Sequence, residues 1–161
     1  MFLRAMLLRA MFLRALVAFL VLPGVVAGVV PVAWLALTRQ TTLVQPYGLP
    51  PLAAGVVGLL WCVRDFYVAG RGTLAPWAPP TELVIVGVYR HSRNPMYVAV
   101  TLVLLGWAVA FGAPGLFVYA VAVAMAFHLR VVHGEEPWLA RTHGRAWEEY
   151  ARRVPRWVSR V

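Results

Sequence analysis

Four apolar runs, separated by segments that carry arginine, constrain the fold of this chain most. The runs are Ala15–Leu37, Tyr47–Val63, Met96–Gly112 and Leu116–Val132. The first has 23 residues without a charge and the last two have 17 each, near the lower limit for crossing a hydrocarbon core of about 30 Å. Because 61% of the residues are apolar and 13% are charged, we expect an all-α integral membrane bundle of about four transmembrane helices.

The order of the runs predicts their connections. The last two are joined only by "APG", which favours a tight helical hairpin. The segment that follows, "FHLRVVHGEEPWLARTHGRAWEEYARRVPRWV", has a helical pattern that ends at Pro155. We expect one domain over residues 1–161, with an N-terminal span region at 1–46 and the chemically distinctive core at 70–161.

Arginine placement predicts the orientation. All fifteen cationic side chains are arginine, and fourteen lie in the first, third and fifth hydrophilic segments, whereas Arg39 lies on the other side. The positive-inside rule therefore predicts that both termini and the 70–95 loop are cytoplasmic. The net charge of +9 does not indicate nucleic-acid binding, because the arginines separate apolar runs instead of forming a basic-aromatic module.

The N-terminus repeats a five-residue unit, "MFLRA MLLRA MFLRA". Five residues advance a helix by about 140°, so Arg4, Arg9 and Arg14 spread around it instead of forming a stripe. We interpret the repeats as a basic lead-in that orients the chain. A cleaved signal peptide is the alternative, but the 23 uncharged residues that follow favour an uncleaved span.

The loop between the second and third runs carries most of the unusual residues. Its prolines forbid a continuous helix, and the β-branched "ELVIVGVY" at 82–89 predicts a short extended or interfacial segment. Arg90, His91 and Arg93 follow at the water boundary, where arginines commonly contact lipid phosphates. Asp65 lies beside Arg64, and we interpret the two as an ion pair at the end of a span.

The histidines and the cysteine do not form a metal site in this pattern. His128 and His133 are five residues apart, about 140° around a helix, so they do not converge. His91 and His143 lie in separate segments, and the single cysteine, Cys62, excludes an intramolecular disulfide. We therefore predict no metal and no haem.

Two blocks resemble one known family. "GVYRHSRNPMY" resembles the G-x-Y-x-x-x-R-[HN]-P-x-Y signature of the isoprenylcysteine carboxyl methyltransferases and related membrane phospholipid methyltransferases. "EEPWLARTHGRAWEEYARRVPRW" resembles their E-E-x-x-L-x-x-x-F-G-x-x-Y-x-x-Y-x-x-x-V-P pattern, and "GTLAPWAPPTELV" is similar to the proline-rich lead-in of bacterial members. Together the blocks cover about half of the chain in the family's order.

The resemblance implies a membrane methyltransferase that depends on S-adenosylmethionine. In that family the cofactor pocket faces the cytoplasm beneath the C-terminal segment, and the acceptor enters laterally from the bilayer. Carried over by position, Arg130 would contact the acceptor. The cofactor-binding residues would be Leu83, Val84, Tyr89, Asn94, Pro95, Met96, Tyr97 and Glu135.

Four positions depart from the family pattern: Asn94 replaces a common His, Ala99 a Gly, His143 a Phe and Trp147 a Tyr. Asparagine cannot titrate, so no general-base role is assigned to Asn94. The other three changes alter packing or pocket shape, and they bear on the identity of the acceptor more than on the reaction.

The residues leave several readings open. The acceptor is expected to be lipophilic or amphipathic, with a prenylcysteine-like carboxylate, a lipid head group or a thiol as its nucleophile. A carboxylate needs no general base, whereas a protonated amine does, and the glutamates are candidates. Glu135 and Glu136 also have a simpler interpretation as salt-bridge partners of the tail arginines. The alternative function is a non-catalytic four-helix membrane scaffold or lipid-binding subunit.

Overall fold

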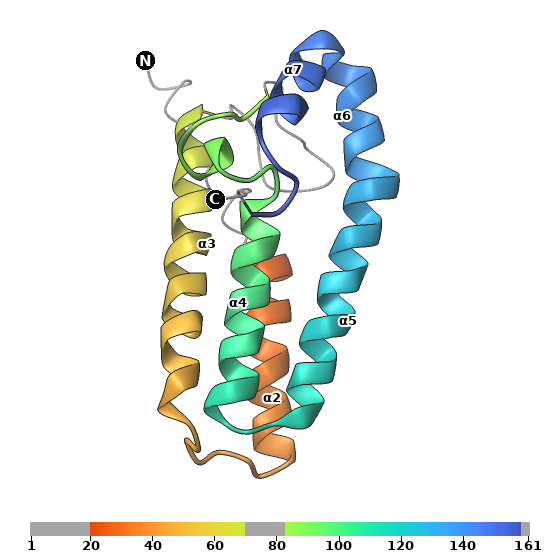
Figure 1. Cartoon of the computed structure of the whole chain (residues 1–161). Helices are drawn as coiled ribbons and strands as arrows, with labels where there is room; N and C mark the ends of the chain where they lie inside the picture. Colours follow the sequence, from red (N-terminus) through yellow and green to blue (C-terminus); the bar gives the residue numbers. More distant parts are fainter. Residues whose placement is uncertain (1–19, 70–82, 159–161) are drawn as a thin grey trace, which may run out of the picture.

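A computed structural model describes residues 20–69 and 83–158, and Figure 1 shows four apolar helical segments standing side by side. A π-helical stretch, Leu20–Val29, runs directly into the first of the labelled helices, α2 (Val30–Leu37). The other helices of the bundle are α3 (Leu49–Ala69), α4 (Pro95–Ala110) and α5 (Pro114–Arg130). No strand occurs in the described residues. The all-α prediction is confirmed.

Two stretches are long and apolar enough to cross a membrane. They are Pro46–Asp65 and Pro114–His143, with 20 and 30 residues, whereas the apolar helices Pro23–Leu37 and Pro95–Ala110 are shorter. Only 22% and 17% of the residues in the apolar windows of the long helices are buried. A core helix of a soluble protein would be mostly buried, so these outward-facing apolar side chains fit a lipid environment.

Some predictions fall outside the described residues. These are the "MFLRA" repeats, the start of the first apolar run at 15–19, and the proline-rich lead-in at 72–82. Within the described part, the hairpin between α4 and α5 forms as predicted, with α5 beginning at Pro114 directly after Ala113.

Small residues let α3 and α4 approach closely. A Cβ atom placed on Gly55 would lie 2.7 Å from the carbonyl oxygen of Ala99, and one on Gly106 would lie 2.6 Å from the backbone nitrogen of Leu52. Neither glycine could therefore carry a side chain without separating the helices. The buried core beside this contact is Ala27, Leu59, Ala99, Val100, Val103, Leu104 and Ala120.

The tail continues α5 and then folds back. A π-helical segment, Val131–Glu135, joins α5 to α6 (Glu136–His143), and α7 (Arg145–Arg153) follows a break at Gly144, where φ is 49°. Val154 is extended because it precedes Pro155, and the chain leaves the helix there. The predicted helical tail and its end at Pro155 are confirmed, although the break at Gly144 was not predicted.

The segment before α4 differs from its prediction. Leu83–Ile85 has no regular structure, and Gly87–Arg90 is a 3-10 turn, which contradicts the extended alternative there. The interfacial alternative stays a prediction. The cause of the turn is Asp65 on α3, whose Oδ2 accepts a hydrogen bond from the backbone nitrogen of Val88 at 3.0 Å. The predicted ion pair is present, since Nη1 of Arg64 lies 3.8 Å from Oδ1 of Asp65. The Arg64 side chain is 71% exposed whereas that of Asp65 is 6% exposed, so the buried carboxylate also holds the turn.

Replacing Gly87 by Ala is expected to destabilise the protein by at least about 2 kcal/mol. Gly87 has φ of 56°, a conformation that costs other residues roughly 1–2 kcal/mol. An added Cβ would also collide with the Asp65 carboxylate. Thermal unfolding of the purified protein in detergent measures the loss.

Gly134→Ala is the matched control for this change. A Cβ at Gly134 meets nothing within 4 Å and the residue lies in a helical segment, so Ala should stabilise it by about 0.5–1 kcal/mol. Equal unfolding temperatures for the two variants would contradict the role given to Gly87.

Candidate active site

Three of the predicted site residues meet where the start of α4 lies beside the end of α5. The hydroxyl of Tyr97, in the first turn of α4, donates a hydrogen bond to Oε1 of Glu135. The Nε of Arg130, at the end of α5, donates to the same oxygen at 2.7 Å. The second oxygen, Oε2, has no hydrogen bond to the described residues. The Glu135 carboxylate thus links Tyr97 on α4 to Arg130 on α5, and its Oε2 remains available to accept a hydrogen bond from a ligand.

The π-helical segment explains why Arg130 reaches Glu135. In an α-helix, residues five apart lie about 140° apart, and their side chains diverge. The segment Val131–Glu135 instead has the wider π-helical turn, in which the backbone bonds run from residue i to i+5. Residues five apart then lie nearer to one face, so the carboxylate turns back toward the arginine.

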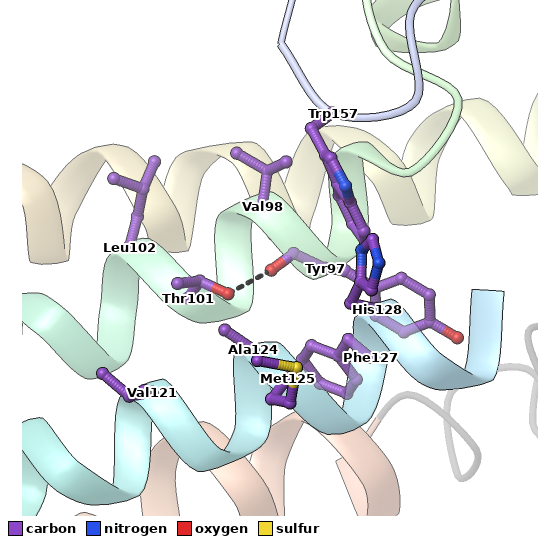
Figure 2. Close-up of a pocket in the computed structure, with 10 residues that line it drawn as sticks. All are labelled: Tyr97, Val98, Thr101, Leu102, Val121, Ala124, Met125, Phe127, His128 and Trp157. Carbon is purple, nitrogen blue, oxygen red and sulfur yellow. Dashed lines mark hydrogen bonds between the residues drawn. The ribbon is translucent and has the colours of Figure 1, made fainter. Parts of the chain in front are cut away.

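An apolar cleft of about 640 Å³ lies beside this cluster, between α4 and α5 (Figure 2). It opens on the outer surface of the bundle, where Val121 and Met125 are exposed. At the end near the cluster, the ring of Tyr97 stacks on Phe127 with 4.3 Å between ring centroids. The lining residues are Tyr97, Val98, Thr101, Leu102, Val121, Ala124, Met125, Phe127, His128 and Trp157.

Glu136, the neighbour of Glu135, has a separate set of partners. Its carboxylate lies 3.0 Å from Nη1 of Arg93 and accepts two hydrogen bonds of 2.8 Å from Arg156. The Arg93 guanidinium lies 5.4 Å from the ring centroid of Trp147, and its buried Nε has no hydrogen-bond partner among the described residues. Hydrogen bonding to Glu136 raises the pKa of Arg156 above its ordinary value.

The C-terminal segment is thereby held over the start of α4. The carbonyl oxygen of Arg156 accepts hydrogen bonds from Ser92 at 3.4 Å and from Nδ2 of Asn94 at 3.1 Å. The backbone nitrogen of Arg93 donates to the Pro155 carbonyl at 2.9 Å. We define Val154–Trp157 as the C-terminal strap. The side-chain amide of Asn94 therefore helps to hold the strap in place.

The remaining predicted cofactor residues have contacts of their own. Tyr89 is buried, with a hydrogen bond between its hydroxyl and Cys62, and its carbonyl accepts a hydrogen bond of 2.7 Å from Tyr150. Burial raises the pKa of Tyr89 well above its ordinary value and that of Tyr150 to about 12. Leu83 packs against the cluster of Trp147, Tyr150 and Val154.

The other three residues have surroundings of different kinds. Pro95 is the first residue of α4, where its missing N–H costs nothing. Met96 packs against the buried core of the bundle, and Val84 is buried. The structure therefore brings Tyr97, Glu135 and Arg130 together, while the cofactor and acceptor roles of all the predicted residues stay predictions.

Sequence reasoning missed four residues that shape this end of the molecule. Asp65 and Arg156 act through long-range contacts that no local pattern shows. Trp157 and His128 line the cleft, but the histidine was considered only as a metal ligand. In the described residues, no group of three or more His, Cys, Asp or Glu side chains is placed to hold a metal ion.

Comparison with known proteins gives one family match. A family model described as phospholipid methyltransferase matches residues 51–146, more than half of the chain. The matched region contains all of the predicted site residues and ends before the C-terminal strap.

Two curated proteins are similar over part of their length. Delta(14)-sterol reductase TM7SF2 of Mus musculus is 33% identical over 94 residues, 56% of this chain and 22% of the reductase. The nickel-cobalt-cadmium resistance protein NccN of Alcaligenes xylosoxydans xylosoxydans is 31% identical over 117 residues, 71% of this chain and 49% of that protein. The chain therefore spans about half, or less, of these relatives. No solved structure matches it significantly.

Proposed function

This chain belongs to the phospholipid methyltransferase family, and on that premise we propose that it is a membrane methyltransferase that uses S-adenosylmethionine and acts on a lipophilic acceptor. The observation that carries the proposal is the convergence of Tyr97, Arg130 and Glu135 beside an apolar cleft that opens on the outer surface of the bundle. A polar cluster next to a lipid-accessible apolar site suits an amphipathic substrate. The arginine distribution supports an active site on the cytoplasmic side.

The residues present fit the cofactor. S-adenosylmethionine carries a sulfonium and an amine, which are both positive, and ribose hydroxyls that donate hydrogen bonds. Glu135 offers a carboxylate oxygen without a partner among the described residues, on a side chain that is 32% exposed. Tyr97 holds this carboxylate in place through its hydroxyl. When bound, the cofactor supplies an electrophilic methyl group.

The cleft would hold the hydrophobic part of the acceptor. Its volume of about 640 Å³ falls within the range of small-molecule sites, roughly 300–1,000 Å³. Arg130, 50% exposed at its side chain, lies where the head group of such a molecule would meet water. Its guanidinium N–H groups other than the one on Glu135 would be able to hold an anionic part of the head group.

The protein's contribution to this reaction is alignment and the exclusion of water. Methyl transfer is an in-line displacement, so a fixed approach of the two reactants lowers the barrier without further chemistry. The strap, through Arg156 and Trp157, covers the start of α4 and one wall of the cleft. This cover limits water at the polar cluster while the outer side stays open to lipid.

The first test uses the detergent-purified full chain. Calorimetry should show saturable binding of S-adenosylmethionine and of S-adenosylhomocysteine. Transfer of the labelled methyl group into a membrane lipid extract should then give a product that mass spectrometry identifies. Because one curated relative is named a reductase, the product mass also separates addition of a methyl group from addition of hydrogen.

The alternative function, a scaffold or lipid-binding subunit, predicts the opposite result. The same cluster would then be a set of structural ion pairs, and folded protein would bind no cofactor at concentrations up to about 1 mM, the upper range of typical KM values. That outcome would overturn the methyltransferase proposal.

A further inference from the structure

One ionisable side chain in the cleft has no role in the function proposed above. His128 lies on α5, half-buried, two residues before Arg130. Its ring lies beside that of Trp157 from the strap, with 5.9 Å between centroids and a tilt of 32°. Figure 2 shows the two rings together at the end of the cleft where Tyr97 lies. Neither ring nitrogen has a hydrogen bond to the described residues.

The other polar groups of the cleft are already engaged. The Tyr97 hydroxyl donates to Glu135, and the Thr101 hydroxyl donates to the carbonyl of Tyr97 at 2.8 Å. The remaining lining residues are apolar or, in Trp157, carry only an N–H donor. Among the described lining residues, the imidazole of His128 is therefore the group that remains to accept a proton from an incoming head group.

The charged groups near His128 are paired with one another. On its own helix, Arg130 pairs with Glu135 of the π-helical segment, and the two charges balance. On α4, Tyr97 presents its hydroxyl to that carboxylate. From the strap, Arg156 is paired with Glu136. Each cation among these groups therefore has a carboxylate partner, and an imidazole is a side chain that commonly serves in proton transfer.

We propose that His128 is the general base for an acceptor whose nucleophilic atom carries a proton, an amine or a thiol on a single apolar chain. This inference rests on the proposed function. For a thiol, the proton passes from sulfur to an imidazole nitrogen, and a sulfur electron pair forms the new bond to the methyl carbon. The bond from that carbon to the sulfonium breaks, its electron pair stays on the cofactor's sulfur, and His128 releases the proton to water.

The test compares three matched probes that share a dodecyl chain and differ in head group. They are dodecanethiol, dodecylamine and dodecanoate, each presented in detergent with labelled S-adenosylmethionine to the purified full chain. We expect His128→Gln to reduce methyl transfer to the thiol and the amine by about 10²- to 10⁴-fold. We expect the wild-type rate of methyl transfer to fall as the pH is lowered below neutrality, and His128→Gln to lack this fall. Imidazole added to His128→Ala should restore part of the rate.

His133→Gln is the matched control, because His133 is exposed and does not line the cleft. It should keep the wild-type rate and pH profile. A His128→Gln variant with an unchanged profile, or a wild type that methylates dodecanoate alone, would overturn the assignment of His128.

Calorimetry separates this failure from failure of the proposed function. If the wild type binds no S-adenosylmethionine, the methyltransferase proposal fails. If wild type and His128→Gln bind it equally and transfer methyl groups equally, only the base assignment fails.

Discussion

Replacing Glu135 by Gln is expected to weaken the binding of S-adenosylmethionine by roughly 10- to 100-fold. Glu135 is the carboxylate that Tyr97 and Arg130 share through Oε1, and Oε2, which has no hydrogen bond to the described residues, would accept one from the cofactor. Hydrogen bonds to charged groups contribute about 1.5–3 kcal/mol, and about 1.4 kcal/mol corresponds to a factor of ten. Glutamine keeps the size of the side chain but removes the negative charge that would face the sulfonium or the amine. Calorimetry on detergent-purified protein measures the change.

Glu149→Gln provides the control for this result. Glu149 lies on α7, is 48% exposed at its side chain and has a distant i,i+4 partner in Arg145, at 3.9 Å. The substitution removes the same charge from an exposed site, where such pairs contribute little. Equal losses of affinity in the two variants would show that Glu135 is not the cofactor carboxylate.

Glu136→Gln is expected to release the C-terminal strap. Glu136 pairs with Arg93 and Arg156, and without it the Arg93 guanidinium, 12% exposed, keeps its charge without a counterion. Removing one partner of a fully buried pair costs about 3–5 kcal/mol. Because the Arg156 side chain is 35% exposed, we expect a smaller loss, about 2–3 kcal/mol.

Limited proteolysis measures this release. When opening and closing are fast relative to cleavage, the rate follows the population of the open form, so trypsin should cut at Arg156 roughly 30- to 140-fold faster in the variant. Glu148→Gln removes a charge from an exposed position on α7 and should leave that rate unchanged. If both variants are cut equally fast, the Glu136 ion pairs do not hold the strap.

The sequence predicted the helical bundle well because its signals are local. Apolar length and the short "APG" connection each act within a few residues, and α4 and α5 form over the two runs that this connection joins. The extended alternative for "ELVIVGVY" was wrong at Gly87–Arg90 because β-branched composition does not report a distant partner. Asp65, 23 residues before Val88, accepts its N–H and favours a turn there.

The candidate site was predicted as one set and is divided in the structure. Tyr97 and Glu135 meet, but Tyr89 packs inward near Cys62, and the side chain of Asn94 contacts the strap. Matching a family motif indicates which residues belong to one site. The direction of each side chain depends instead on its position around the helix and on the residues that contact it. The two adjacent glutamates show this directly, since Glu135 faces Arg130 and Glu136 faces Arg93 and Arg156.

By itself, the sequence determined the apolar runs, the hairpin and the helical tail that places Glu135 and Glu136 after the last run, because burial in lipid and helix termination are decided by nearby residues. The tertiary structure decided that Arg130 meets Glu135 and that His128 faces the cleft beside Trp157. The first depends on a π-helical turn that changes the helical phase, and the second on the return of the strap across the start of α4. Both bring together residues whose separation along the chain does not reveal their contact.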